Sequence, residues 1–296
     1  MDLQSLNIFI QVAELNSFTR AAEKLGYSQP TISFQIKQLE KELGVQLFDR
    51  VGHTVSLTEA GKSALHYAQS ICQLSQEMVM GDKKYDVNGI VRIAMAESLV
   101  NPLIATTFSD IKSKYPQLSI NIMTGMTAEL FDLLNHNEVD LICVLDSPVR
   151  DTSYIVVSEE EINVHVVVSK NNPLAVKKNI KIEDLLSQSF ILTEKGMSYR
   201  RLFDEEMAKY KIEILPILEM SNPKSICNLV KEDLGISFLP DFVTNKAVEE
   251  GSIVRLHVKG LDIKIWKQLL YHRDKWVNSQ MKALIQHLSN IHIQNR

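Results

Sequence analysis

The chain has 296 residues, of which 45% are apolar and 23% charged, and a formal net charge of −4. This composition excludes a disordered or fibrous chain, and the length favours two or three domains. The negative net charge excludes any argument for nucleic-acid binding from bulk charge alone. Because no run of about 18 apolar residues and no basic leader are present, we expect a cytoplasmic protein without membrane contact.

The three cysteines, Cys72, Cys143 and Cys227, form no Cys-x-x-Cys pair and are odd in number. This pattern argues against a disulfide framework and against a zinc site. We expect no metal and no cofactor.

The first 44 residues predict three helices. Apolar residues at three- and four-residue steps indicate a helix over 3–14, and Ser17 caps "FTRAAEKL", which ends at Gly26. Ser28 then caps a helix with Pro30 in its first turn, which stops at Gly44. Two short helices joined by a tight glycine-containing turn form a helix-turn-helix, although three packed helices without a DNA role fit the pattern equally well.

The solvent face of the third helix favours the DNA-binding alternative. Once Ile32, Ile36 and Leu39 are assigned to the core, small polar side chains and one aromatic, Phe34, remain outside. Amides and hydroxyls pair with base edges or phosphates, and an aromatic group contacts a thymine methyl. Residues 1–61 hold five basic and seven acidic residues, so binding depends on where the charges lie.

Residues 1–61 resemble the winged helix-turn-helix of the LysR-type transcriptional regulators. The resemblance rests on "FIQVAELNSFTRAAEKLGYSQPTISFQIKQLEKELGVQLFDR" followed by "SLTEAG". It implies a DNA-binding domain over 1–58 with a wing around Gly52, and a bacterial regulator. The DNA-binding residues that we expect are Arg20, Ser28, Gln29, Pro30, Thr31, Ser33, Phe34, Lys37, Arg50 and His53. Phe34, Val51 and His53 stand where relatives often carry cations, which predicts a shallow salt dependence.

Residues 59–88 are expected to form a linker helix and a hinge. Leu57, Ala64, Ile71 and Met78 recur every seven residues, which indicates a seam between two paired helices. The alternative is a helix that packs on its own domain. The resemblance favours dimerisation and implies a homodimer or homotetramer. The stretch "GDKKYDVNG", 81–89, marks the domain boundary.

Residues 89–296 alternate between predicted strands and helices, which indicates an α/β fold with mostly parallel sheets. The region resembles the effector domain of the same family, which has two Rossmann-like lobes with a ligand cleft between them. We expect lobe I over 89–161 and 269–296, and lobe II over 162–268. The predicted strands are 90–96, 118–124, 141–145, 162–169, 190–193, 213–220, 235–240, 252–258 and 263–272.

The carboxyl ends of the strands are the expected effector site, because ligands of open α/β sheets bind there against helix N-termini. The expected residues are Glu97, Ser98, Thr124, Gly125 and Thr127 of lobe I and Lys195, Gly196, Ser198, Tyr199 and Arg200 of lobe II. Hydroxyls, amides and an arginine favour a small anion such as a carboxylate, whereas Glu97 disfavours one. The alternative is that Ser98, Thr127 and Ser198 merely cap their helices.

The leading interpretation is a transcriptional regulator that binds double-stranded promoter or operator DNA under the control of a small-molecule effector. RNA polymerase is a further candidate partner. We expect no catalytic residues, because no Gly-x-Ser-x-Gly, P-loop or dinucleotide fingerprint occurs. A thiol-based redox sensor on the same scaffold would need a cysteine of low pKa, and Cys227 has Lys224 and Lys231 at helical spacing.

Overall fold

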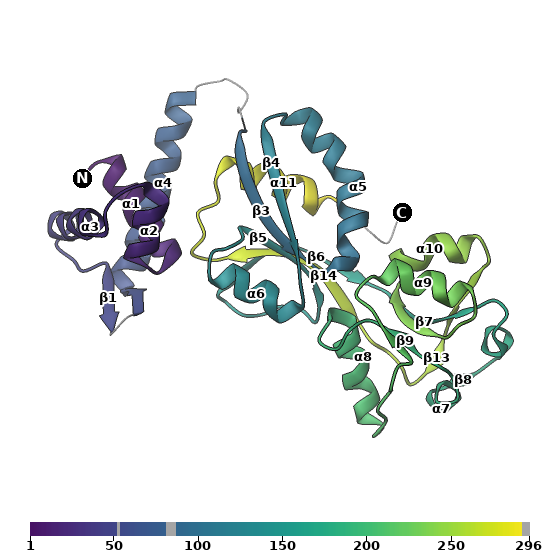
Figure 1. Cartoon of the computed structure of the whole chain (residues 1–296). Coiled ribbons are helices and arrows are strands. Elements are labelled where there is room, and N and C mark those ends of the chain that lie inside the picture. The colour runs from purple at the N-terminus through teal and green to yellow at the C-terminus, as the bar shows by residue number, and fades with distance from the viewer. Residues whose placement is uncertain (52–53, 81–86, 292–296) are drawn as a thin grey trace.

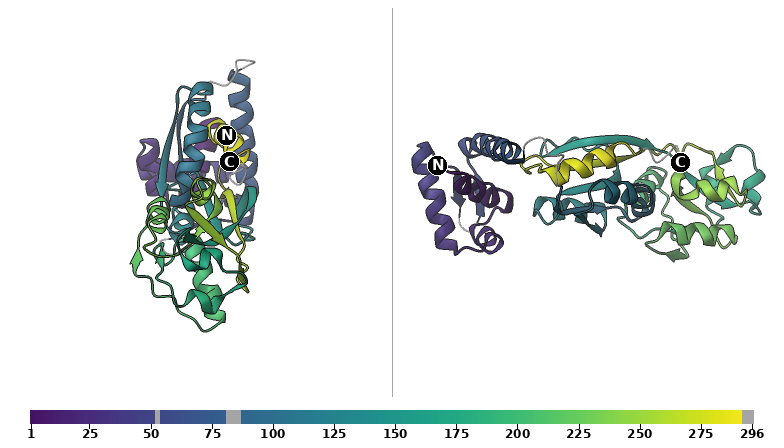
Figure 2. Two further views of the ribbon diagram at one scale, coloured as in Figure 1. Left: turned by 90° about the vertical axis from the view of Figure 1, so that its right-hand side faces the viewer. Right: turned by 90° about the horizontal axis from the view of Figure 1, so that it is seen from above.

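The structure is a computed structural model that describes residues 1–51, 54–80 and 87–291. Its parts follow one another in space as they do in the sequence: a small helical domain, a long helix and two α/β lobes (Figure 1). Seen from above, the helical domain, lobe I and lobe II lie in a row (Figure 2). No helix in the described ranges has both the length and the hydropathy needed to span a membrane.

The N-terminal domain contains the three expected helices and a hairpin. Their bounds are Leu3–Leu15 for α1, Phe18–Leu25 for α2, Gln29–Leu43 for α3, Phe48–Val51 for β1 and Thr54–Leu57 for β2. Side chains of Asp2, Ser17 and Ser28 cap the three helices. The rings of Phe9 and Phe18 each contact Phe48 edge-on at 5.5 Å between centroids, so the hairpin is fixed to the helices.

The linker helix α4, Glu59–Met80, packs one side on its own domain. Leu65, Ala68 and Cys72 are buried with the core residues of α1 to α3. Ile71 and Leu74 are exposed. The apolar surface of α4 is therefore divided. Leu65 and Cys72, each one position after a residue of the expected seam, pack on the core of their own domain, whereas Ile71 and Leu74 leave apolar surface for another helix.

Lobe I is built on one five-stranded sheet in the order β4-β3-β5-β14-β6. The strands are β3 (Gly89–Met95), β4 (Leu118–Thr124), β5 (Leu141–Asp146), β6 (Tyr154–Ile162) and β14 (Ile265–His272). The first three are parallel, and β14 is antiparallel to both of its neighbours. Helices α5 (Glu97–Lys114) and α11 (Ser279–Ser289) cover one face, and α6 (Thr127–Asn135) covers the other.

Strand β6 was missed in the sequence because "SEEEI" reads as a solvated acidic stretch. In the structure each glutamate has a cation: Glu159 pairs with Arg150, Glu160 with the buried Lys267, and Glu161 with Lys264. Lys264 and Lys267 are distant in sequence from β6, so the local pattern does not reveal these two pairs.

Lobe II is smaller and more mixed than expected. Its central sheet has the order β11-β7-β12 and is antiparallel, which corrects the prediction of mostly parallel sheets. The expected strand 213–220 shortens to two residues, since Leu215 and Ile217 are exposed. The strands are β7 (Val164–Ser169), β8 (Ile180–Lys181), β9 (Ile191–Leu192), β10 (Leu218–Glu219), β11 (Ser237–Pro240), β12 (Ile253–Leu256) and β13 (Val258–Lys259).

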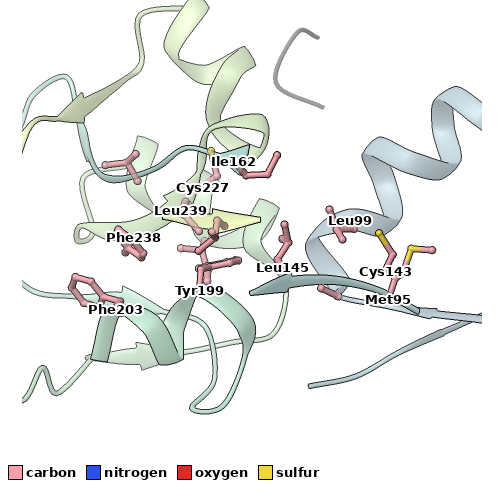
Figure 3. Close-up of a cluster of buried hydrophobic side chains, with 14 of the residues drawn as sticks. Met95, Leu99, Cys143, Leu145, Ile162, Tyr199, Phe203, Cys227, Phe238 and Leu239 are labelled. Atoms are coloured by element: carbon pink, nitrogen blue, oxygen red, sulfur yellow. The ribbon is translucent and has the colours of Figure 1, made fainter. Parts of the chain in front are cut away.

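Five helical segments surround these strands. They are the 3-10 helix η1 (Pro173–Val176) and the α-helices α7 (Ile182–Leu185), α8 (Ser198–Lys209), α9 (Pro223–Lys231) and α10 (Asp241–Glu249). The stacked rings of Phe203 and Phe238, 4.7 Å apart, fix α8 on β11. Figure 3 shows Leu145 and Leu99 of lobe I facing this cluster, and the buried core is continuous between the lobes.

A charged cluster around Asp140 fixes the edge of lobe I. The carboxylate lies 2.8 Å from both Arg92 Nη2 and Lys275 Nζ. Burial by itself raises the pKa of Asp140, but the hydrogen bonds and charges of Arg92 and Lys275 outweigh burial and hold the pKa below its usual value.

Asp140→Asn should lower the free energy of unfolding by roughly 3 kcal/mol, because it leaves the buried Lys275 without a counter-charge. Since the folded pKa is depressed, the stabilisation is present above about pH 4 and is lost as pH falls through the folded pKa. Urea unfolding across pH measures both effects. Asp110→Asn, at an exposed position of α5, is the control, and equal stability of the two variants would contradict the prediction.

Candidate DNA-binding surface and effector cleft

The first turns of α3 present the expected polar face to solvent. Ser28, Gln29, Pro30, Thr31 and Lys37 are exposed, and Ser33 is half-buried. Phe34 is 64% exposed, which is unusual for a large aromatic side chain. At this exposure the ring contributes little to the packing of its own domain. The face therefore combines hydroxyls, an amide, one ammonium and one aromatic ring on the outer side of the second helix of a helix-turn-helix.

Hydrogen bonds order this face in the absence of DNA. Ser28 Oγ accepts from the Thr31 backbone N–H at 3.3 Å and lies 2.8 Å from Thr31 Oγ1. Gln29 Nε2 donates to Ser33 Oγ at 2.9 Å. These bonds hold the side chains in defined rotamers, which reduces the entropy lost when they bind a partner.

The wing is present, but only part of it is described. Arg50 lies in β1 opposite Val55, and its side chain lies outside the described residues, as does the whole of His53. Arg20, the remaining expected DNA contact, is directed elsewhere: its Nη2 donates to the His136 carbonyl of lobe I at 3.2 Å.

The two lobes touch across the cleft at the loops that follow their strands. A Cβ built on Gly196 of lobe II would lie only 3.1 Å from Met126 Sδ of lobe I. Nearby, Arg201 of α8 forms an ion pair with the buried carboxylate of Asp146 at the end of β5. Glycine at position 196 therefore permits this close approach, and the ion pair holds it.

Ser98, Thr127 and Ser198 do not cap the helices that begin at this cleft, which corrects the alternative reading; at α6 it is the Glu129 carboxylate that accepts from the Met126 backbone N–H, at 2.9 Å. The cap positions of α5, α6 and α8 are Ala96, Met126 and Met197, and none caps through its side chain. The three hydroxyls lie in the first turns instead. By contrast, Asn222 and Asn278 cap α9 and α11. Helices α5 and α8 thus keep N-terminal N–H groups without a capping side chain, whereas the Glu129 carboxylate covers the N-terminus of α6.

A pocket of about 300 Å³ lies between α5 and the helices of lobe II. Of the expected residues it contains Glu97 and Ser98. The sequence analysis missed the lobe II side, because nothing in the sequence shows that α9 and α10 face α5. The other lining residues are Asn101, Pro102, Asn222, Pro223, Lys224, Phe242, Val243 and Lys246. The lining thus contains two ammonium groups, of Lys224 and Lys246, and one carboxylate, of Glu97.

Some of the remaining expected cleft residues are free to contact a ligand, and others already contact neighbouring side chains. Thr124 is exposed, and the buried Thr127 Oγ1 has no partner among the described residues. Gly125 lies against Glu129, and Lys195, 67% exposed, faces Glu213 at 3.7 Å.

Tyr199 and Arg200 point into lobe II. Burial raises the pKa of Tyr199, against a smaller opposite effect of the Thr193 hydroxyl. Arg200 is 1% exposed and binds Asp204, Glu219 and the Thr193 carbonyl. Its charge is balanced inside lobe II, so the expected contact of Arg200 with an anion has no support in the structure.

The cysteines lack the properties of redox sensors. All three are buried, and burial raises the pKa of each thiol, that of Cys143 to about 12. A raised pKa suppresses the reactive thiolate, and Lys231 only weakly opposes this effect at Cys227. The redox alternative is therefore not supported.

Two family models match the chain. Residues 3–62 match the family model described as the bacterial regulatory helix-turn-helix protein, lysR family, and residues 86–291 match the LysR substrate binding domain. The helix-turn-helix-type transcriptional regulator YwqM of Bacillus subtilis is 30% identical over 288 residues, which cover 96% of this chain and 97% of that one. The RuBisCO operon transcriptional regulator of Allochromatium vinosum is 30% identical over 277 residues, covering 93% and 91%.

Solved structures support the fold. A full-length OxyR variant from Pseudomonas aeruginosa superimposes with a TM-score of 0.60 at 22% identity, covering 99% of this chain and 96% of that one. Full-length BenM gives a TM-score of 0.56 at 23% identity, covering 100% and 98%. The matched families and relatives are transcriptional regulators and not enzymes. The chain belongs to the LysR family of bacterial DNA-binding transcriptional regulators, with an N-terminal helix-turn-helix and a C-terminal effector-binding domain.

Proposed function

We propose that the protein binds operator DNA sequence-specifically through α3 and the wing, and that a small anion, such as a carboxylate, controls it from the cleft between the lobes. Such a regulator acts in the cytoplasm, where it reaches chromosomal DNA and RNA polymerase.

The uncapped helix ends at the cleft are the observation that carries the anion. The first-turn N–H groups of α5 and α8 donate to no capping side chain, and the first turn of α5 lines the pocket. An oxyanion would accept from such groups, and the helix dipole favours negative charge there. Lys224 and Lys246 add two positive charges to the pocket, against the carboxylate of Glu97 in its lining and that of Glu250, which lies 4.0 Å from Lys246 Nζ. The space suits a small molecule.

The exposed apolar surface of α4 supports a homodimer, from which a homotetramer could be built. Ile71 and Leu74 are 39% and 63% exposed, on the side of α4 turned away from α1. Pairing of two such helices would bury these side chains and place two α3 helices against successive half-sites.

A thermal-shift screen of small carboxylates, each beside its uncharged amide, tests the anion. A carboxylate at 100 times its Kd should stabilise the protein by about 2.7 kcal/mol, whereas its amide should not. Lys224→Ala and Lys246→Ala should each weaken this stabilisation. Lys178→Ala, at an exposed site outside the pocket, should leave it unchanged. Amides that stabilise as well as carboxylates would refute an anionic effector.

Phe34→Arg should strengthen DNA binding broadly, because it adds a cation on the exposed face of α3. The slope of log K against log salt should steepen by about 1 for one added phosphate contact. Gel-shift titrations at several salt concentrations measure the slope. An unchanged slope would place residue 34 away from the DNA backbone.

Thr31→Ala should mainly reduce sequence discrimination, because it removes a hydroxyl from the first turn of the recognition helix. Loss of one base contact costs about 1–3 kcal/mol at one base pair and leaves non-specific binding nearly unchanged. Competition with single-base operator variants measures the effect. A uniform loss of affinity across all variants would instead assign Thr31 to phosphate contact or to helix stability.

A further inference from the structure

The N-terminal domain is docked on lobe I of its own chain through a small, defined contact. The Trp276 backbone N–H donates to Glu14 Oε1 at 3.3 Å, and Gln69 Nε2 donates to the Asp274 carbonyl at 3.2 Å. The Trp276 side chain packs on the hydrophobic core of the N-terminal domain. Together with the bond from Arg20 to His136, these contacts involve α1, α2 and α4 on one side.

The two surfaces fit closely where they meet. A residual space of only about 30 Å³, roughly one water molecule, separates Ala13, Glu14 and Asn16 from lobe I. Its lobe I lining includes Asn137 and Lys275. The half-buried indole and the backbone hydrogen bonds distinguish this contact from loose packing of two polar surfaces.

Each of the two lobe I segments in the contact follows an element that begins at the other end of the lobe. One follows α6, which begins beside the cleft, and the other follows β14, which begins at the crossover, where the chain returns from lobe II to lobe I. Helix α6 starts at Thr127 beside the cleft, and its C-cap residue His136 receives the bond from Arg20. At 1.5 Å per residue, the helix bridges about 13 Å. Strand β14 starts at Ile265, where the chain returns from lobe II, and ends at His272, just before Asp274 and Trp276.

An ion cluster locks these two segments to each other. Lys275 Nζ lies 2.8 Å from Asp140 and also donates to Asn137 Oδ1, at the turn that follows α6. Asp140 in turn binds the Arg92 backbone and guanidinium in β3. The ends of α6 and β14 therefore move as one unit.

We propose that the surface formed by 135–137 and 272–276 is a docking site for the chain's own DNA-binding domain, and that it transmits changes in lobe closure to that domain. Rotation of lobe II about the crossover displaces β14 and α6 at the cleft. Their far ends then shift Trp276 against α1 and α4, which reorients α3. The proposal does not depend on the chemical class of the effector.

Trp276 itself reports on the docking. In a Trp266→Phe background it is the single tryptophan, because the chain has two. Docking predicts a blue-shifted emission and weak quenching by acrylamide in the full-length protein. Glu14→Ala combined with Gln69→Ala should shift the emission to longer wavelength and increase quenching, since both hydrogen bonds to the 274–276 segment are removed. Gln286→Ala, an exposed helical position of lobe I, is the matched control and should change neither.

Transmission is tested by breaking the interlobe ion pair far from the indole. Arg201→Ala, which removes the partner of Asp146, should alter Trp276 quenching in the same background. Added to the Glu14→Ala, Gln69→Ala double variant, Arg201→Ala should not change Trp276 quenching any further. Arg150→Ala breaks the exposed pair with Glu159 within lobe I and should have no effect.

Three outcomes would overturn the inference. Trp276 emission that is solvent-like in the parent protein would remove the contact, and protection that disappears on dilution would assign it to another subunit. An unaltered quenching constant in Arg201→Ala would refute transmission. A carboxylate screen without hits would affect only the proposed effector, because every measurement here is made without one.

Discussion

The chain crosses between the lobes twice, between β6 and β7 and again at the start of β14, and the arrangement of the effector domain depends on this constraint. Because of the two crossings, the carboxyl ends of the strands in both lobes face one cleft. At this cleft Met126 lies close to Gly196, and Asp146 forms an ion pair with Arg201. The helices that follow these strands must then point their N-termini into the same space. The proposed anion site rests on this convergence.

The same crossings give the domain a mechanical connection to the DNA-binding end. Helix α6 starts at the cleft, and its C-cap residue His136 accepts from Arg20, so a single rigid element reaches both. Strand β14 does the same from the crossover to Trp276. Because the 272–276 segment is tied to Asp140 by a buried ion pair, small displacements are not absorbed by a loop.

The DNA-binding surface relies on placement more than on charge. Residues 1–61 carry fewer basic than acidic residues, yet the acids lie mainly away from the exposed first turns of α3. Phe34 occupies the centre of this face with a large apolar surface. On the proposed DNA-binding role of this face, apolar and hydroxyl contacts would give specificity with little dependence on salt, in contrast to a face rich in arginine.

The sequence by itself determined the elements whose signals are local. Capping serines, a proline in the first turn and C-terminal glycines placed α2 and α3, and the alternation after residue 89 indicated the lobes. The physical reason is that caps, turns and helix periodicity depend on neighbours within one or two turns of the chain.

Only the tertiary structure decided the features that depend on distant partners. The acidic β6 is a strand because Lys267 and Lys264 lie beside it, and Arg200 is internal because Glu219 and Asp204 balance its charge. Lys224 and Lys246 become pocket residues only when α9 and α10 face α5. Trp276 meets Glu14 across 262 positions of sequence. Charge balance and burial are properties of the assembled fold, so no pattern along the chain could reveal them.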